Sequence, residues 1–467
     1  MARPLLIFVL MVATTGSAED WSRFRGPNGS GVSNATGLPV TFGPAKNIDW
    51  RSEVPFGRSS PILTADRVIV TGSEGQKLIT VCLDRATGKV VWRREILRDR
   101  TEKIFKGNDT ATPTPASDGR NLYVFFPDFG IVSYSLDGKA RWRLKLGPFH
   151  SFYGISSSPI IHGNTLVLVC DQKSEGFIIA LDKDTGRLRW RKDRPQAKTE
   201  AYSTPIVWTP QNGKAQVIAA GAYRIDAYAI DTGENLWWVG KQGTAPISTP
   251  ALANGLIFVT SWGADKPAYP PWDTIAAKLD KNKDGKISAE EASVDPDWGD
   301  HFGWADRNGD GFLTEDEWNE ILRESVSEHG LVAVRAGGIG DQTETHLVWR
   351  YKKDYSEITS PLVYRDVLYT VKDGGIVTSL NSGTGEVYKT GRSKDAIAAY
   401  FSSPVAADGK VYLVSQDGKV SVLRADPQWE VLAVNDLGEE CQATPAIGGG
   451  SIYIRTAKAL YSFSEKK

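Results

Sequence analysis

The feature that most constrains this chain is a Ser/Thr-Pro dipeptide that recurs ahead of a short apolar run. Examples are "SSPILTADRVIV", "SSPIIHGNTLVLV" and "SSPVAADGKVYLV", and we count the repeats from Pro61, Pro113, Pro159, Pro205, Pro250, Pro361, Pro404 and Pro445. Neighbouring prolines lie 41–52 residues apart, except for one gap of 111 residues. A fixed period of this length is typical of folds built from one repeated supersecondary unit.

The second half of each unit predicts a hairpin. An Asp-to-Gly turn joins two alternating runs, and a Trp follows the turn glycine by four residues, as in Gly88/Trp92, Gly138/Trp142, Gly186/Trp190 and Gly233/Trp237. Each unit therefore has four strands, which we call A to D. Such a unit buries both faces only when copies stack radially, which is a β-propeller. We expect the Trp rings to pack against the neighbouring blade as structural residues.

The two ends of the sequence indicate how the ring closes. The eighth unit ends without a D strand, whereas the early segment "NIDWRSEV" carries the same Trp-Arg pair, Trp50-Arg51, as Trp92-Arg93. We expect residues 46–54 to be the outer strand of blade eight, because a shared sheet leaves no edge open. The predicted fold is all-β: an eight-bladed propeller of four-stranded blades, with a small α-helical insert.

The insert lies in the long gap and contains two loops of the EF-hand type. "DKNKDGKISAEE" and "DRNGDGFLTEDE" place oxygen ligands at positions 1, 3, 5, 7, 9 and 12 and Gly at position 6. We expect two Ca²⁺ sites, with the carbonyl acting at position 7, formed by Asp280, Asn282, Asp284, Lys286, Ser288 and Glu291, and by Asp306, Asn308, Asp310, Phe312, Thr314 and Glu317. The alternative is a pair of acidic turns that bind no metal. The loops start only 26 residues apart with Pro296 between them, so the middle helices must be short.

We place the insert, residues 264–329, between strands B and C of blade five. Residues 19–263 and 330–467 then form the two parts of the propeller. The insert has 17 acidic and 7 basic residues, a net charge of −10, on a propeller that is mildly basic. This charge difference is consistent either with docking of the insert or with a solvated acidic surface.

The loops on one face of a propeller form a candidate ligand site. B–C loops and D–A loops emerge together, and the D–A loops surround the mouth of the central channel. We expect a ligand to contact polar and aromatic residues there: Arg58, Asn108, Asp109, His150, Tyr153, Glu200, Tyr202, Glu357, Tyr400, Phe401 and Glu440. The alternative for each is an exposed loop residue without a binding role.

The first eighteen residues resemble a secretory signal peptide. Arg3 precedes the apolar run Leu5 to Ala13, and small residues lead to cleavage after Ala18. We therefore expect a periplasmic or secreted protein without a membrane span. Without Arg3 the chain has 54 basic and 56 acidic residues, which gives no reason to expect nucleic acid as a partner. The three cysteines, Cys82, Cys170 and Cys441, are too scattered for a disulfide framework.

The repeated hairpin and the segment "WSRFRGPNGSGVSNATGLPVTF" resemble the PQQ-type β-propellers, in particular exported members from environmental bacteria. The resemblance implies the fold; the same fold occurs in alcohol dehydrogenases and in assembly scaffolds. Members that use the quinone share a pair of adjacent cysteines beside it, whereas no two cysteines are adjacent here. We therefore do not expect PQQ. The sixth unit departs from the repeat, with Tyr388 after the turn in place of Trp.

These observations favour one function and leave two open. The first is an exported, calcium-binding propeller, with no catalytic residue assigned, whose channel mouth contacts a protein or a glycan. The second is a quinone-dependent dehydrogenase. The third is a hydrolase or lyase that uses Glu200, Glu357 or Glu440 together with His150 and Tyr153.

Overall fold

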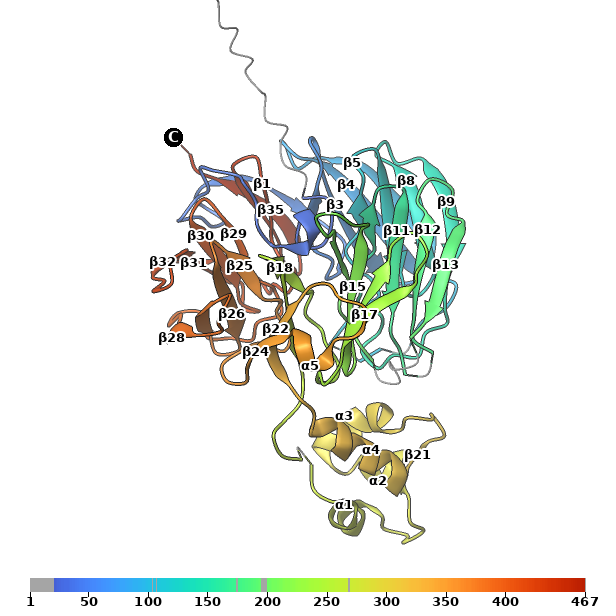
Figure 1. Cartoon of the computed structure of the whole chain (residues 1–467). Coiled ribbons are helices and arrows are strands. Elements are labelled where there is room, and N and C mark those ends of the chain that lie inside the picture. Colours follow the sequence, from blue (N-terminus) through green and yellow to red (C-terminus); the bar gives the residue numbers. More distant parts are fainter. Residues whose placement is uncertain are drawn as a thin grey trace, which may run out of the picture.

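A computed structural model describes residues 21–102, 104–105, 107–173, 175–194, 200–267 and 269–466. Eight separate antiparallel sheets form the ring of blades, and a helical insert projects from one face (Figure 1). The predicted eight-bladed propeller is therefore confirmed. The expected signal peptide, residues 1–18, lies outside the described residues. Among the helices in the described ranges, none is long and apolar enough to cross a membrane.

Blades one to four follow the chain in simple order, each from the channel outward. Their strands are β2 (Ile62–Leu63), β3 (Arg67–Glu74), β4 (Lys77–Asp84) and β5 (Val90–Leu97); β6 (Ala116–Ser117), β7 (Asn121–Phe126), β8 (Gly130–Ser135) and β9 (Ala140–Lys145); β10 (Ile160–His162), β11 (Thr165–Cys170), β12 (Phe177–Asp182) and β13 (Leu188–Asp193); β14 (Ile206–Trp208), β15 (Gln216–Gly221), β16 (Arg224–Ala229) and β17 (Asn235–Val239).

Blades five to eight include the insert and the closure. Their strands are β18 (Ala251–Ala253), β19 (Leu256–Ser261), β22 (Gly330–Arg335) and β24 (Leu347–Tyr351); β25 (Leu362–Tyr364), β26 (Val367–Lys372), β27 (Ile376–Asn381) and β28 (Val387–Arg392); β29 (Val405–Ala407), β30 (Lys410–Val414), β31 (Lys419–Arg424) and β32 (Val431–Asp436); β33 (Ala446–Gly448), β34 (Ser451–Arg455), β35 (Ala459–Ser464) and β1 (Ile48–Glu53). β1 pairs antiparallel with β35, so the predicted outer strand of blade eight is confirmed.

The hydroxyl that precedes each repeat proline joins neighbouring blades at the channel wall. The A strands contact one another and are therefore innermost. At seven of the eight junctions, the backbone N–H of the Ser or Thr donates to the hydroxyl of its counterpart in the next blade, over 2.9–3.0 Å. Seven junctions have this bond: Ser60 to Thr114, Thr114 to Ser158, Ser158 to Thr204, Thr249 to Ser360, Ser360 to Ser403, Ser403 to Thr444, and Thr444 to Ser60.

This ring of hydroxyls corrects one proline of the predicted repeat. The segment "ATPTPAS" contains two Thr-Pro dipeptides, and the predicted repeat uses the first, with Pro113. It is Thr114 that donates to Ser158 and accepts from Ser60, and β6 begins directly after Pro115. Pro115 is therefore the proline in register, because the hydroxyl ring and the start of strand A both follow it.

Tryptophan joins the same blades near their outer edge. At five junctions the indole N–H donates across 2.8–3.0 Å to a carbonyl in the C–D turn of the next blade: Trp50 to Arg85, Trp92 to Leu136, Trp142 to Lys183, Trp190 to Ile230 and Trp349 to Ser382. The turn glycine lies directly against the ring. A Cβ on Gly138, whose φ is +84°, would be 2.8 Å from the ring of Trp92. The predicted structural role of these Trp residues agrees with this geometry.

The junction between blades four and five replaces this Trp contact. Blade five has no short C–D turn, and Trp237 donates instead to Gln216 of its own blade. The longer connection forms β23 (Gly340–Asp341), which pairs in parallel with β17, followed by α5 (Thr343–His346). The long connection thus covers the outer edge of blade four.

At the junction between blades six and seven, the large aromatic ring comes from blade seven instead of from the D strand of blade six. Lys389, four residues after Gly385, stands in the register of the repeat Trp, and Tyr388 occupies the bulge beside it. Our prediction that Tyr388 replaces the Trp was therefore off by one position. Trp429 from the C–D connection of blade seven fills the space, and Lys389 Nζ lies 4.3 Å from the centre of its ring. At the next junction Phe42 packs on Phe463 with ring centroids 4.9 Å apart.

Residues 21–33 cross the end of the channel that is opposite the D–A loops. This segment includes the short 3-10 helix η1 (Pro27–Gly29). Its backbone and arginines bind blades one, two, four, six and seven through Leu63, Ser117, Pro205, Pro361 and Ala406. Contacts to such widely spaced blades require that the segment spans the channel. The predicted mouth residues lie at the other end, in the D–A loops.

The insert leaves the propeller after β19 and returns at β22, which pair with each other. It contains α1 (Trp272–Leu279), β20 (Ile287–Ser288), α2 (Ala289–Ala292), α3 (Pro296–Ala305), β21 (Phe312–Leu313) and α4 (Glu315–Ser325). The two calcium-type loops pair through β20 and β21, with Ile287 opposite Leu313. Trp272, Ile275 and Trp318 are buried in the small core. The middle helices are short, as the sequence predicts.

The Trp contact leads to a stability test in which two glycines are compared. Replacing Gly138 with Ala introduces a Cβ at positive φ, at a cost of about 1–2 kcal/mol, and displaces Trp92 at a further cost of about 1–3 kcal/mol. Gly163→Ala is the control, since its φ is +55° but no atom lies within 4 Å of the new Cβ. We expect thermal unfolding to show a larger loss for Gly138→Ala. Equal losses would mean that the Trp contact contributes little.

Candidate functional site at the channel mouth

All eleven predicted mouth residues lie in D–A loops, between the D strand of one blade and the A strand of the next. The loops are residues 54–61 with Arg58, 98–115 with Asn108 and Asp109, 146–159 with His150 and Tyr153, 194–205 with Glu200 and Tyr202, 352–361 with Glu357, 393–404 with Tyr400 and Phe401, and 437–445 with Glu440. The structure gathers some of them into two clusters and leaves the others apart.

The first group, which we call the Glu200 cluster, contains Asn108, Tyr153, Glu200 and Tyr202. Asn108 donates to the carbonyl of Tyr153 over 2.6 Å, and the rings of Tyr153 and Tyr202 meet edge to face at 5.7 Å. Glu200 accepts hydrogen bonds from the Tyr202 hydroxyl and from the backbone N–H of Phe152. Burial raises the pKa of Glu200. Both carboxylate oxygens are thus engaged within the loops.

The second group, which we call the Arg58 cluster, contains Arg58, Asp109 and Glu440, whose D–A loops connect blades seven, eight, one and two. Arg58 Nε lies 3.9 Å from Asp109 Oδ2, an oxygen that is buried and has no hydrogen-bond donor among the described residues. Burial raises the pKa of Asp109. Glu440 accepts from Gln416 over 3.0 Å and from Gln442 over 2.8 Å, and these bonds lower the pKa of Glu440. The cluster combines both charges with the half-buried amides of Gln416 and Gln442.

The remaining predicted residues do not converge with these clusters. The ring of His150 is exposed, while its backbone bonds to Gln172 and Lys173 fix the loop. Glu357 lies beside Tyr355, and burial raises its pKa. Tyr400 is 1% exposed and its hydroxyl donates to the carbonyl of Ala396. We infer a structural role for Tyr400, which sequence reasoning could not separate from an exposed ligand residue.

The insert packs against the D–A loops on the side of blades two and three. The ring of His301 on α3 stacks at 6.0 Å from Phe105 and at 6.3 Å from Phe152, which is the neighbour of Tyr153. The sequence analysis missed Phe105 and Phe152. The aromatic run "FHSFYG" in a D–A loop was the available signal, because exposed aromatics in a loop need a packing partner.

The calcium-type loops have the backbone that such loops require. Gly285 and Gly311 adopt φ of +80° and +87° at position 6. Asp280 Oδ2 accepts from the N–H of Gly285 over 3.0 Å, while Asp280 Oδ1 is buried without a donor among the described residues. The Glu291 and Glu317 carboxylates accept backbone N–H groups within their loops. Within the described ranges, no three His, Cys, Asp or Glu side chains are gathered closely enough to hold a metal ion.

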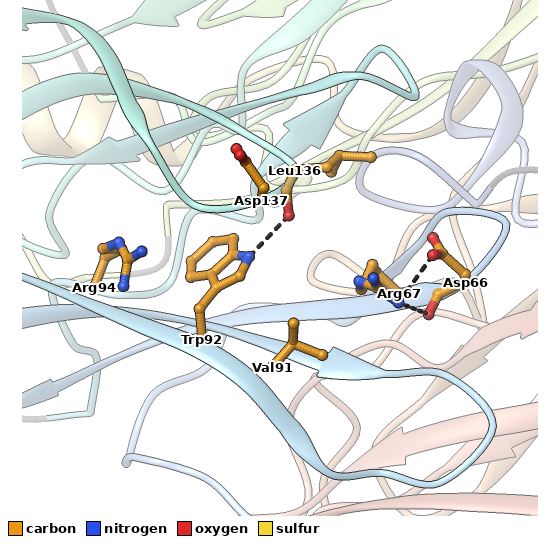
Figure 2. Close-up of a pocket in the computed structure, with 7 residues that line it drawn as sticks. All are labelled: Asp66, Arg67, Val91, Trp92, Arg94, Leu136 and Asp137. Carbon is orange, nitrogen blue, oxygen red and sulfur yellow. Dashed lines mark hydrogen bonds and ion pairs between the residues drawn. The ribbon is translucent and has the colours of Figure 1, made fainter.

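A separate pocket of about 500 Å³ lies away from the mouth (Figure 2). It is lined by Asp66, Arg67, Val91, Trp92, Arg94, Leu136 and Asp137. Figure 2 shows the indole of Trp92 donating to the carbonyl of Leu136 in this pocket. The pocket is therefore the space around a structural Trp contact between blades one and two, on the side of the C–D turns. We assign no chemistry to it.

The two glutamates with opposite pKa shifts give a test of the clusters. Glu200 has a raised pKa, so its stabilising contribution is present at low pH and is lost as pH rises through that pKa. Glu440 has a lowered pKa, so its contribution is present above the unfolded value of about 4.3 and is lost as pH falls. For each of Glu200→Gln and Glu440→Gln, the unfolding temperature is compared with that of the unsubstituted protein at several pH values. The difference should change with pH in opposite directions for the two variants. A change in the same direction for both variants would contradict the raised pKa of Glu200 or the lowered pKa of Glu440.

Comparison with known proteins agrees with the fold. A family model described as outer membrane protein assembly factor BamB matches residues 43–282 and 337–466, and an EF-hand model matches residues 277–291 and 300–322. Outer membrane protein assembly factor BamB of Francisella salina is 29% identical over 115 residues, which are 25% of this chain and 20% of that protein. Quinohemoprotein alcohol dehydrogenase ADH IIB of Pseudomonas putida is 25% identical over 228 residues, 44% of this chain and 32% of that protein.

These curated relatives are matched over only a fifth to a third of their own length. The crystal structure of BamB from Moraxella catarrhalis is similar in fold, with a TM-score of 0.54 and 14% identity, and the match covers 89% of this chain and 100% of that one. Because the family model matches well over half of the chain, the protein belongs to the PQQ-type propeller family described as outer membrane protein assembly factor BamB.

Proposed function

We propose that this protein is an exported, calcium-binding propeller that acts as a binding or scaffold protein and catalyses no reaction. The mouth would contact a macromolecular partner on the side that the insert leaves open. A protein is the preferred partner, because relatives of the same family are named assembly factors, and a glycan is the alternative. Export rests on the signal-peptide pattern in residues 1–18.

The observation that carries this proposal is that the acid–base candidates at the mouth already have structural partners. Glu200 accepts from Tyr202 and Phe152, Glu357 from Tyr355, and Glu440 from Gln416 and Gln442. A general base must instead be within reach of a substrate proton, and a nucleophile needs a neighbouring base. His150, which would act together with one of these glutamates, has an exposed ring. A hydrolase or lyase site is therefore poorly supported.

The open side of the mouth has the character of an interaction surface. We define it by the D–A loops 54–61, 393–404 and 437–445. Phe56, Ile397 and Phe401 are 50%, 59% and 38% exposed, and Arg58 and Glu440 lie in the same loops. Exposed apolar side chains among charged and amide groups are typical of protein-binding sites, where a few large anchors contribute most of the affinity.

Calcium would bind the two loops of the insert. Asp280, Asn282, Asp284, the Lys286 carbonyl, Ser288 and Glu291 would hold one ion, and the corresponding residues from Asp306 to Glu317 the other. The orphaned, buried Oδ1 of Asp280 fits a cation at position 1 of the first loop. The bound ion supplies positive charge that offsets the repulsion of three carboxylates in each loop. The chain supplies a paired scaffold, because Ile287 and Leu313 join the loops.

A quinone-dependent dehydrogenase is the second candidate, and the partial match to a quinohemoprotein alcohol dehydrogenase favours it. The separated cysteines argue against it. We expect that incubation with PQQ and calcium, followed by gel filtration and an absorbance scan, leaves no bound quinone, and that dye-linked oxidation of alcohols is absent. Stoichiometric retention of PQQ would overturn the proposed function.

Calcium removal gives a second test. Chelation should increase hydrogen exchange within residues 264–329 while the blades keep their protection, because the small core of the insert depends on metal binding. Glu291→Gln with Glu317→Gln should have the same effect. The matched control is Glu290→Gln with Glu315→Gln, which removes exposed glutamates beside the same loops that are not ligand positions. Equal exchange with and without calcium would contradict calcium binding.

A further inference from the structure

One lysine of the propeller binds the start of the second calcium loop. Lys173 lies in the B–C loop of blade three, between β11 and β12. Its Nζ is 2.5 Å from the carbonyl of Gly303, 3.4 Å from that of Trp304 and 3.3 Å from that of Asp306. These carbonyls end α3 and begin the loop, since Asp306 holds position 1. The ammonium group of Lys173 thus fixes the backbone of Asp306, the first ligand residue of the loop.

A second contact supports the same end of the insert. Arg307, at position 2 of the loop, pairs with Glu324 on α4 over 2.6 Å and lies 5.0 Å from the centre of the Trp304 ring. The hydroxyl of Tyr223, in the B–C loop of blade four, hydrogen-bonds to Glu324. Blades three and four therefore both hold the second loop through side chains that the sequence analysis did not single out.

The two loops differ in their surroundings. Asp306 and Glu317, at positions 1 and 12 of the second loop, are each 8% exposed. In the first loop residues 281–286 are all exposed, and Asp280 and Glu291 are half-buried. A substitution on blade three can therefore affect one loop without touching the other, and the chain provides its own internal control.

We propose that Lys173 is a positioning residue for the second calcium loop, and that calcium binding there is coupled to docking of the insert on blade three. This inference rests on the proposed binding of calcium. Three carbonyls at a helix C-terminus are held by one ammonium group, which also interacts favourably with the helix dipole. Because the loop start is already ordered, calcium binding has less conformational entropy to overcome.

The coupling acts in both directions. If docking favours calcium at the second loop, calcium at that loop favours docking by the same factor. Docking brings His301 against Phe105 and Phe152, beside the Glu200 cluster. Calcium at the second loop would therefore hold α3, with His301, in place beside the Glu200 cluster. Calcium at the first loop would mainly order the exposed part of the insert.

A competing effect has the opposite sign, which makes the proposal testable. A lysine near the loop repels calcium, so removing its charge alone would strengthen binding. Loss of positioning weakens binding instead, and substitution of residues that orient metal ligands typically reduces affinity 10- to 100-fold. The direction of the change in affinity therefore distinguishes positioning from simple repulsion.

The experiment isolates each loop in the full-length protein. Glu291→Gln leaves the second loop intact, and Glu317→Gln leaves the first. Calorimetric titration with calcium should show that Lys173→Met weakens binding about tenfold in the Glu291→Gln background and leaves the Glu317→Gln background unchanged. Lys173→Arg, which keeps the charge and the donors, should restore most of the affinity. Calcium should also lower hydrogen exchange in residues 149–155 of the Glu291→Gln protein, and Lys173→Met should abolish that protection.

Two kinds of outcome overturn the inference. Unchanged or tighter binding at the second loop in Lys173→Met, or equal weakening at both loops, would show that Lys173 does not position that loop, while the calcium proposal would stand. A complete lack of calcium binding by the unsubstituted protein would overturn both. Failure of Lys173→Met to keep the blades folded would be seen as loss of exchange protection throughout the propeller, and the Lys173→Arg result then decides.

Discussion

The ring depends on hydrogen bonds that join backbone to side chain between neighbouring blades, and seven of its eight junctions have one at the channel wall. On the channel side a Ser or Thr hydroxyl accepts the N–H of its counterpart in the preceding blade, as in Ser60 to Thr114. Near the rim a Trp indole donates to a carbonyl in the next C–D turn, as in Trp92 to Leu136. Each blade is a sheet whose faces are buried only by its neighbours, so these two bonds fix the spacing at both ends of the apolar layer between blades. One end of each bond is a backbone atom, which explains why the intervening strands can vary in sequence.

The junctions that lack the Trp contact show what can take its place. Between blades four and five, β23 extends the sheet and α5 packs beside it. Between blades six and seven, Trp429 enters from the following blade, with Lys389 over its ring. Between blades seven and eight, Phe42 from the segment before β1 packs on Phe463. At the last two of these junctions a large aromatic ring fills the space, and between blades four and five a strand and a short helix do so, because an unfilled gap between two blades would forfeit dispersion contacts along its whole lining. Each junction therefore requires that the space between the blades near their outer edge is filled, and a Trp side chain most often fills it.

The architecture was predictable from the sequence because it depends on a period, and local details were less so. The blade count, the closure by residues 46–54 and the paired loops all follow from repeated spacing. Pro113 was misplaced because "ATPTPAS" offers two registers, and Tyr388 was misplaced because it follows Gly385 by three residues, whereas the repeat Trp follows its glycine by four, where blade six has Lys389. At the mouth the sequence predicted the loops but not their grouping. Asn108 bonds to the backbone of Tyr153, and His301 stacks on Phe105, across separations of 45 and 196 residues, and no local pattern specifies such contacts.

The position of the insert divides the mouth into two chemically different parts. On one side, His301 and the aromatic rings of Phe105 and Phe152 lie beside Glu200, whose carboxylate is buried and fully hydrogen-bonded. On the other, Arg58, Glu440 and the amides of Gln416 and Gln442 remain near exposed Phe56 and Phe401. A carboxylate with a raised pKa would by itself suggest catalysis, yet here the burial that raises the pKa also leaves Glu200 only 4% exposed. In the proposed function a partner would therefore contact the exposed groups on the open side, whose mixed charge and exposed rings suit recognition of a surface.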